Sequence, residues 1–299
     1  MGQRRNLHGA RILITGASQG IGRAMALEAA RRGAVVLAAA RNEPLLAELA
    51  AEARSKGLTI HIVQADVTDP AGRAAMVDAA QHHLGGLDVL INNAGIGATG
   101  HFADASPQRM RQIFEVNFFG LTETTRVCLP LLKQGRTPAI LNISSVAGRR
   151  GLPARSDYSA SKFAVQGFSE ALRSELAKDG IDVLLVNPGL TQTNFSKNMI
   201  EQKAKMQLDH LRGMTSEQVA SLSLDALARG RNEVTFTLQG RLLLLVNRFF
   251  PWFVDMMTRR KVRQLFKEEI EARRAGKLLP VHSLPNNSLP DNPREPAST

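Results

Sequence analysis

Short apolar runs alternate with longer amphipathic stretches along most of the chain, and this alternation restricts the possible folds more than any other feature. The run 34–40 is apolar throughout, as expected for a strand that is covered on both faces. Strands that are joined through helices run parallel, so the pattern predicts an α/β fold with a doubly wound parallel sheet. The predicted strands are 11–15, 34–40, 59–64, 87–91, 139–143, 181–186 and 234–238, and the predicted helices are 21–32, 42–56, 71–83, 107–134 and 157–178.

A glycine-rich turn, Thr15-Gly16-Ala17-Ser18-Gln19-Gly20-Ile21-Gly22, joins the first predicted strand to the first predicted helix. Glycines let the backbone turn sharply and approach a pyrophosphate, which then lies against the N–H groups and the positive dipole end of the helix. The turn lacks the Lys-Ser/Thr pair of a P-loop. It indicates a nucleotide site of another kind, with a glycine-rich turn that binds no ligand as the alternative.

Further motifs follow in a fixed order along the chain. They are Asn92-Asn93-Ala94-Gly95 after the fourth predicted strand, Asn117 in the next helix, Asn142-Ile143-Ser144-Ser145 at the end of the fifth strand, Tyr158-Ser159-Ala160-Ser161-Lys162 at the start of the following helix, and Pro188-Gly189 with Thr191 and Thr193 after the sixth strand. This set resembles the short-chain dehydrogenase/reductase family over roughly residues 8–238. The resemblance implies a Rossmann-type sheet and hydride transfer between a nicotinamide and a carbonyl/secondary alcohol pair.

Tyr158 and Lys162 are four residues apart, so their side chains share one face of the predicted helix. An ordinary phenol, with a pKa of about 10, exchanges protons poorly at neutral pH, and a neighbouring ammonium group is expected to lower that pKa. A partly buried tyrosine beside a surface lysine is the alternative for this spacing taken alone. The resemblance implies that Tyr158 exchanges a proton with the substrate oxygen and that Lys162 tunes Tyr158 and binds the cofactor ribose.

Two more polar residues belong to the catalytic set that the resemblance implies. Ser145 is the hydroxyl expected to bond the substrate oxygen, and because side chains alternate along a strand, only one of Ser144 and Ser145 should face the site. Asn117 is expected to help hold a water that leads protons to Lys162, with a polar residue that bends a helix as the alternative. All four groups are present, which argues against a catalytically silent nucleotide-binding or membrane-surface module.

The end of the second predicted strand bears on the choice of cofactor. An acidic residue there would bind the adenosine ribose hydroxyls and repel a 2′-phosphate, but this strand ends in Ala40 and Arg41. A guanidinium group binds a 2′-phosphate well, so Arg41 favours NADP(H), while a solvated arginine and an NAD-linked alcohol dehydrogenase remain as alternatives. The expected cofactor-binding residues are Gly16, Ser18, Gln19, Gly20, Ile21, Gly22, Arg41, Asp66, Val67, Asn93, Ala94, Gly95, Tyr158, Lys162, Pro188, Gly189, Thr191 and Thr193.

Composition restricts the cellular compartment and the partners that are expected for the protein. The 299 residues include 38 lysines and arginines against 27 acidic residues, a net charge of +11, and a single cysteine. One cysteine excludes an internal disulfide, and no apolar run is long enough for a spanning helix, so we expect a cytoplasmic protein. The pI of 10.5 would suit nucleic acid, but neither zinc-finger spacing nor an aromatic RNA-binding motif occurs, so no nucleic-acid partner is expected. His82-His83 has no companion metal ligands, so no metal is expected.

We assign the part of the chain that resembles the family to a domain of residues 8–240. The chain continues beyond this domain. Leucine and aromatic residues followed by many basic residues predict an amphipathic helical extension over 241–279, with Pro251 at the start of its second helix. This extension fits a cover over the substrate cleft, a dimer contact, or peripheral membrane contact through 241–278. The proline-rich tail 280–299 is expected to be disordered.

The resemblance carries three further expectations. A homodimer or homotetramer would form through the predicted helices 107–134 and 157–178. The variable region 194–212 would form a lid that sets the choice of substrate. The apolar lid and extension favour a hydrophobic substrate of the lipid, steroid or ketoacyl kind, as in membrane-associated members that the extension resembles.

Overall fold

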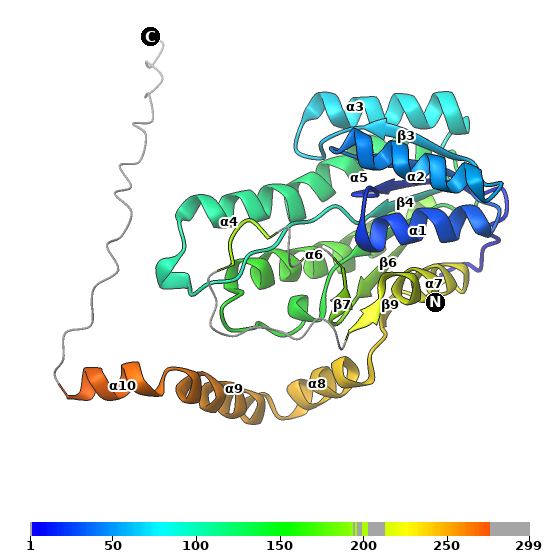
Figure 1. Cartoon of the computed structure of the whole chain (residues 1–299). Helices are drawn as coiled ribbons and strands as arrows, with labels where there is room; N and C mark the ends of the chain where they lie inside the picture. The colour runs from blue at the N-terminus through cyan, green and yellow to red at the C-terminus, as the bar shows by residue number, and fades with distance from the viewer. Residues whose placement is uncertain (1, 194, 196–198, 203–212, 276–299) are drawn as a thin grey trace, which may run out of the picture.

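A seven-stranded parallel β-sheet lies at the centre of the protein and carries helices on both faces (Figure 1). The computed structural model describes residues 2–193, 195, 199–202 and 213–275. The strand order is β3-β2-β1-β4-β5-β6-β9, which confirms the predicted doubly wound α/β fold. The strands are β1 (Arg11–Thr15), β2 (Val35–Ala40), β3 (Ile60–Gln64), β4 (Val89–Asn92), β5 (Ala139–Ile143), β6 (Asp182–Asn187) and β9 (Glu233–Thr235), and a separate short pair is formed by β7 (Thr191–Gln192) and β8 (Met214–Thr215).

Ten α-helices are found in the described part of the chain, and most of them follow a strand directly. They are α1 (Gly20–Arg31), α2 (Glu43–Ser55), α3 (Pro70–Ala79), α4 (Pro107–Phe114), α5 (Gly120–Leu132), α6 (Ser156–Glu175), α7 (Ser216–Ala228), α8 (Leu238–Phe249), α9 (Pro251–Leu265) and α10 (Lys267–Arg274). Side chains cap several N-termini. The Asn42 side chain accepts a hydrogen bond from the Leu45 N–H at α2, and Thr215 with Gln218 forms a capping box at α7.

Alternate side chains of each central strand enter two separate cores, one on each side of the sheet. Ile12 and Ile14 of β1 belong to the core beneath α1, α2 and α7, whereas Leu13 of the same strand belongs to the core beneath α3, α5 and α6. All three side chains are fully buried. Because both faces are covered, the central strands consist mainly of consecutive apolar residues rather than alternating apolar and polar ones.

The predicted helix 107–134 is present as one unbroken helical run from Pro107 to Leu132, but it is not α-helical throughout. It consists of α4, a π-helical segment at Glu115–Phe119, and α5. Asn117 lies in the π-helical segment and is fully buried. A helical repeat in the sequence does not reveal the extra residue that a π turn inserts, so the helix was predicted but its π-helical segment was not.

The predicted strand 234–238 is shorter than expected. It ends as β9 at Thr235, because the Thr237 hydroxyl accepts a hydrogen bond from the Gly240 N–H at 3.1 Å and so caps α8. Helix α8 therefore begins at Leu238. The short pair β7–β8 was not predicted.

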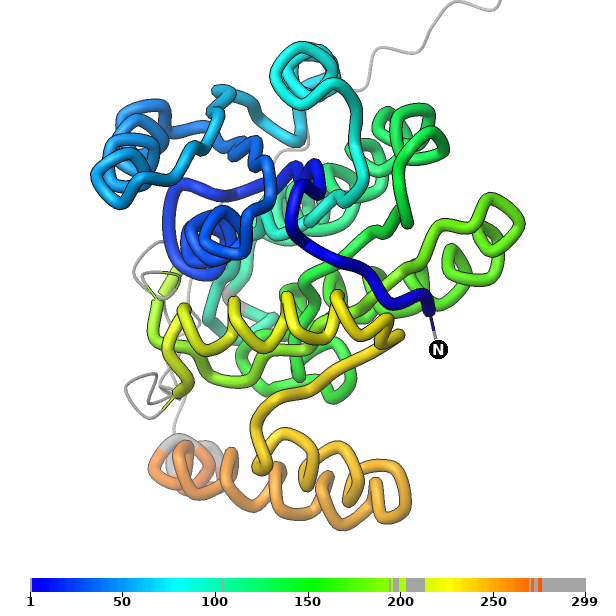
Figure 2. The backbone as a smooth tube through the Cα atoms, turned by 90° about the vertical axis from the view of Figure 1, so that its right-hand side faces the viewer, coloured from blue at the N-terminus to red at the C-terminus, as the bar shows by residue number. Residues whose placement is uncertain are grey.

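Helices α8, α9 and α10 follow one another along one side of the molecule (Figures 1 and 2). Helix α9 begins at Pro251, as predicted. Arg150, which follows β5, holds this segment through hydrogen bonds to the Asn247 and Asp255 side chains at 3.0 and 2.5 Å. None of the helices in the described residues has the length and hydropathy needed to cross a bilayer. The predicted disordered tail 280–299 lies outside the described residues.

Candidate active site

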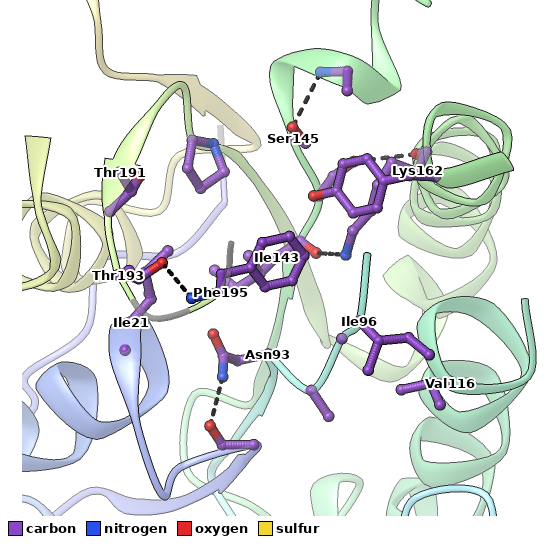
Figure 3. A pocket seen from close by; sticks show the side chains of 18 of the residues that line it. Ile21, Asn93, Ile96, Val116, Ile143, Ser145, Lys162, Thr191, Thr193 and Phe195 are labelled. Atoms are coloured by element: carbon purple, nitrogen blue, oxygen red, sulfur yellow. Dashed lines mark hydrogen bonds between the residues drawn. The ribbon is translucent and has the colours of Figure 1, made fainter. Parts of the chain in front are cut away.

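A cavity of about 1010 Å³ opens at the carboxyl ends of the central strands. It lies where the chain leaves β1 and β4 toward opposite faces of the sheet, which is where doubly wound folds bind their ligands. Figure 3 shows Ser145 and Lys162 on one side of this cavity and Thr191 and Thr193 on the other. All the predicted catalytic and cofactor-binding residues line the cavity except Gly22 and Asn117.

The glycine-rich turn is locked against the turn that follows β4. Gly16 has a φ of +64°, and a Cβ at this position would lie 2.7 Å from the Ala94 Cα. The Asn93 side-chain amide donates hydrogen bonds of 3.0 Å to the carbonyl oxygens of Thr15 and Gly16. The Thr15 hydroxyl in turn accepts from the Asn93 and Ala94 N–H groups, each at 3.1 Å. Gly22, which does not line the cavity, gives the first turn of α1 room to pack against this junction.

The residues of this turn fit the phosphates of a dinucleotide. The Gln19 side chain makes no capping hydrogen bond at the N-terminus of α1, and the first helical residues, Gly20 and Ile21, line the cavity. The first N–H groups of this helix therefore suit a bound anion. Ser18 and Gln19 line the cavity at the same point. A pyrophosphate placed there would meet backbone donors and the positive end of the helix dipole.

Arg41 lies at the rim of the cavity, directly after β2. Its guanidinium group is 65% exposed, and its Nη1 atom is 3.7 Å from Oδ2 of Asp66. Asp66 and Val67 line the cavity on the neighbouring strand end. The chain therefore offers an exposed cation and a carboxylate on this rim rather than a carboxylate alone.

Tyr158, Ser145 and Lys162 lie together on the opposite side of the cavity. The Ser145 hydroxyl lies close enough to the Tyr158 side chain to lower the pKa of Tyr158. The Lys162 Nζ atom lies 5.9 Å from the centre of the Tyr158 ring and donates a hydrogen bond to the Ile143 carbonyl at 2.9 Å. Ser144 is buried and donates to the Lys162 carbonyl instead, so Ser145 is the serine of this pair that faces Tyr158.

The electrostatics of Tyr158 differ from the sequence-based expectation. Burial raises the pKa of Tyr158, and the Ser145 hydroxyl and the charge of Arg155 only partly oppose this increase. Lys162, which is expected from the sequence to lower that pKa, instead directs its buried ammonium at the Ile143 carbonyl. Burial lowers the pKa of Lys162 to about 8.

Asn117 lies behind the cavity wall rather than on its surface. Its Nδ2 atom donates to the Ile96 carbonyl and to the Ser161 hydroxyl, both at 3.0 Å, and its Oδ1 atom accepts from the Ile96 N–H at 2.8 Å. A Cβ on Gly95 would lie 3.2 Å from Asn117 Oδ1 and 3.6 Å from Lys162 Nζ. Asn117 therefore joins the strand end after β4 to helix α6, next to Lys162.

Arg155 is a site residue that sequence reasoning missed. It lines the cavity one helical turn before Tyr158 and is 8% exposed. Within the described residues its guanidinium group has neither a hydrogen-bond acceptor nor an ion-pair partner, in contrast to the buried Arg109, which pairs with Asp157 and Glu201. Burial lowers the pKa of Arg155. The spacing Arg-x-x-Tyr at the start of a helix was the signal that could have indicated it.

Several apolar residues that line the cavity were also missed. Ile96, Val116, Leu152 and Leu243 were not among the expected site residues. Phe195 belongs to the predicted lid, and its ring centre lies 5.8 Å from that of Tyr158. Ile200 of the same region is 43% exposed, and most of the predicted lid lies outside the described residues.

Comparison with known proteins gives the class of protein to which this site belongs. The family model described as short chain dehydrogenase matches residues 10–204. The chain belongs to the short-chain dehydrogenase/reductase family, and it is therefore an oxidoreductase acting on CH–OH groups with a nicotinamide dinucleotide.

Particular relatives cover most of the chain. It is 35% identical to dehydrogenase/reductase SDR family member 7B of Bos taurus over 75% of this chain and 72% of that protein. It is 32% identical to the ketoacyl reductase HetN of Nostoc over 85% of this chain and 89% of that protein. A solved short-chain dehydrogenase/reductase of Burkholderia phymatum in complex with NAD has a TM-score of 0.76 and 28% identity, covering 82% of this chain and 94% of that chain.

Proposed function

We propose that the protein transfers a hydride between NADP(H) and the carbon of a carbonyl/secondary alcohol pair in a hydrophobic substrate. The observation that carries the proposal is that Tyr158, Ser145 and a buried Lys162 lie together on the wall of a cavity lined with glycines. A nicotinamide bound there supplies or accepts the hydride. The apolar lining formed by Leu152, Phe195 and Leu243 supports a substrate that is apolar around its reacting carbon.

The side chains supply the proton and the hydrogen bonds that the reaction needs besides the hydride. In the reductive direction Tyr158 gives its proton to the substrate oxygen as the carbon gains the hydride, so that a carbonyl becomes an alcohol. Ser145 hydrogen-bonds the same oxygen and polarises the carbonyl group. Because burial keeps the pKa of Tyr158 above its ordinary value, the hydroxyl is protonated at neutral pH, and this favours reduction. Lys162 holds the ribose of the cofactor, and Asn117 keeps the strand end beside Lys162 in place.

The preference for NADP(H) rests on Arg41. Its exposed guanidinium lies at the cavity rim with a long ion pair to Asp66, so a 2′-phosphate within reach would gain charge-assisted hydrogen bonds. Arg41→Ala is expected to weaken NADPH binding about tenfold or more and to leave NADH binding unchanged, measured by fluorescence titration. Arg54→Ala, an exposed arginine on α2, is the control. Tighter binding of NADH by the unaltered protein would reassign it as an NAD-linked dehydrogenase.

A panel of ketones and aldehydes with NADPH, followed by the loss of nicotinamide absorbance, tests the activity. Tyr158→Phe is expected to lower kcat by roughly 10²–10⁴-fold while NADPH binding is retained. Ser145→Ala should lower kcat strongly and Ser144→Ala much less, because only the first hydroxyl faces Tyr158. Cofactor binding without turnover of any compound would favour a catalytically silent nucleotide-binding module instead.

We also propose a homodimer or homotetramer that uses the long helices on one face of the sheet. Phe119, which precedes α5, and Phe163 of α6 are 48% and 45% exposed, and exposed aromatic rings on neighbouring helices support such a contact. Sedimentation velocity is expected to show a dimer or larger species that Phe119→Ser/Phe163→Ser weakens. A monomer at all concentrations would contradict this part of the proposal.

A further inference from the structure

Helices α8 and α9 expose an unusual concentration of large apolar side chains. Nine of them have exposed fractions between 41% for Phe253 and 80% for Leu238. We call these nine residues the apolar face: Leu238, Leu242, Leu245, Phe249, Phe250, Trp252, Phe253, Met256 and Met257. The surface of a soluble protein rarely exposes so many large apolar side chains on two successive helices without a partner that covers them.

The spacing of these residues places them on one side of each helix. In α8, Leu238, Leu242, Leu245 and Phe249 follow the i, i+4, i+7, i+11 pattern of a single helical face. In α9 the exposed aromatic residues occupy the first turn, next to the end of α8. Figures 1 and 2 show the two helices in succession on the same side of the molecule.

Basic side chains surround the apolar face. Helices α8 and α9 carry six basic residues and a single carboxylate, Asp255, which pairs with Arg150. The basic residues are Arg241, Arg248, Arg259, Arg260, Lys261 and Arg263. All six are exposed. An apolar face with many exposed cations on the same helices matches the interface of an anionic bilayer, which offers apolar chains next to negative headgroups.

Helix α8 forms part of the wall of the active-site cavity. Thr237, Gln239, Gly240 and Leu243 line the cavity from the first turns of α8. A Cβ on Gly240 would lie 3.2 Å from Val146, which follows Ser145, so α8 packs directly on the segment that carries the catalytic serine. The outer side of α8 is thus the apolar face, and its inner side belongs to the cavity.

We propose that the apolar face of α8 and α9 inserts into the interfacial region of an anionic membrane and holds the cavity mouth against it. A second copy of the chain fits this surface less well, because two faces each bordered by six cations would repel one another, whereas anionic headgroups would attract them. The substrate class that follows is a carbonyl compound dissolved in the bilayer. This last point rests on the proposed function, but membrane binding does not.

Co-sedimentation with vesicles tests the proposal on the full-length protein. Binding is expected with vesicles of phosphatidylcholine and phosphatidylglycerol, and it should weaken with phosphatidylcholine alone or at high salt. Leu242→Ser/Leu245→Ser and, separately, Phe249→Ser/Trp252→Ser should each lower the partition coefficient by about tenfold or more. Val35→Ser/Leu222→Ser is the matched control, because it removes two exposed aliphatic side chains elsewhere on the surface and should leave binding unchanged.

The outcomes separate the possible occupants. Full-length protein that stays in the supernatant, or variants of the apolar face that bind as well as the control, would overturn the proposal. Variants that change the sedimentation coefficient of the free protein and not its vesicle binding would assign the face to a second copy. Since the vesicle assay needs neither cofactor nor turnover, its result does not depend on the proposed enzymatic function. That function is tested separately, by measuring how fast the same variants reduce a water-soluble ketone.

Discussion

Replacing Lys162 by methionine is expected to stabilise the folded protein at neutral pH while it removes activity. Burial lowers the pKa of Lys162 from 10.5 to about 8, so the folded state holds its proton less tightly than the unfolded state does. Each pH unit of such a difference corresponds to about 1.4 kcal/mol, so the buried ammonium costs roughly 3 kcal/mol of the free energy of unfolding below pH 8. Methionine removes this cost but leaves the Ile143 carbonyl without its donor, which opposes the gain by about 1–2 kcal/mol.

The net effect is a stabilisation of about 1–2 kcal/mol at neutral pH, measured by urea unfolding. The sign of the pH dependence follows from the depressed pKa. Between pH 8 and 10.5 the unfolded chain binds more protons at Lys162 than the folded chain, so the unaltered protein gains stability with rising pH relative to the variant. The advantage of Lys162→Met should therefore shrink across this range.

Lys178→Met is the matched control, because Lys178 is exposed on the surface and its replacement should change stability by less than about 0.5 kcal/mol. The reasoning would be refuted if Lys162→Met were less stable than the unaltered protein at neutral pH with a difference that does not change up to pH 10.5. Such a result would mean that the ammonium is not a strained group but an ordinary structural partner of the Ile143 carbonyl.

Three further changes test other parts of the site and its frame. Arg155→Met removes the cation that partly offsets the burial of Tyr158, so the limb of the kcat–pH profile that reports Tyr158 should move upward by up to about one pH unit, and Arg155→Lys should restore it. Gly16→Ala should weaken NADPH binding and destabilise the fold in thermal unfolding by more than the roughly 1–2 kcal/mol of left-handed backbone strain expected for Gly57→Ala. Both glycines have a positive φ, but only Gly16 has neighbouring atoms that an added Cβ would meet. Equal losses of stability in the two variants would contradict this. Asp88→Asn should lower the free energy of unfolding in urea by about 3–5 kcal/mol. Burial raises the pKa of Asp88, but hydrogen bonds from Arg11 and Arg136 outweigh burial and lower the pKa below its ordinary value. The charged carboxylate therefore stabilises the fold above about pH 4 and loses this effect as the pH falls, and the variant should lack that acid-dependent loss.

Local patterns were enough to predict the frame of the protein and most of its site. A continuous apolar run such as β2 is expected between two layers of helices, and the glycine-rich turn after β1 is typical of a site where the backbone approaches a nucleotide closely. The four-residue spacing of Tyr158 and Lys162 fixes their shared helix face by covalent geometry alone. These features depend on residues that are close in sequence, so they can be predicted from the amino-acid sequence alone.

Tertiary structure decided the properties that depend on distant neighbours. The direction of the pKa shift of Tyr158 follows from burial and from Arg155 and Ser145, and no local pattern gives the solvation of a side chain. The position of Asn117 behind the cavity wall follows from a π-helical segment that an ordinary helical repeat conceals. The sequence by itself determined an apolar and basic extension, but only packing decided which side of α8 faces the cavity and which side is left for solvent or a membrane, because burial is a property of the assembled chain.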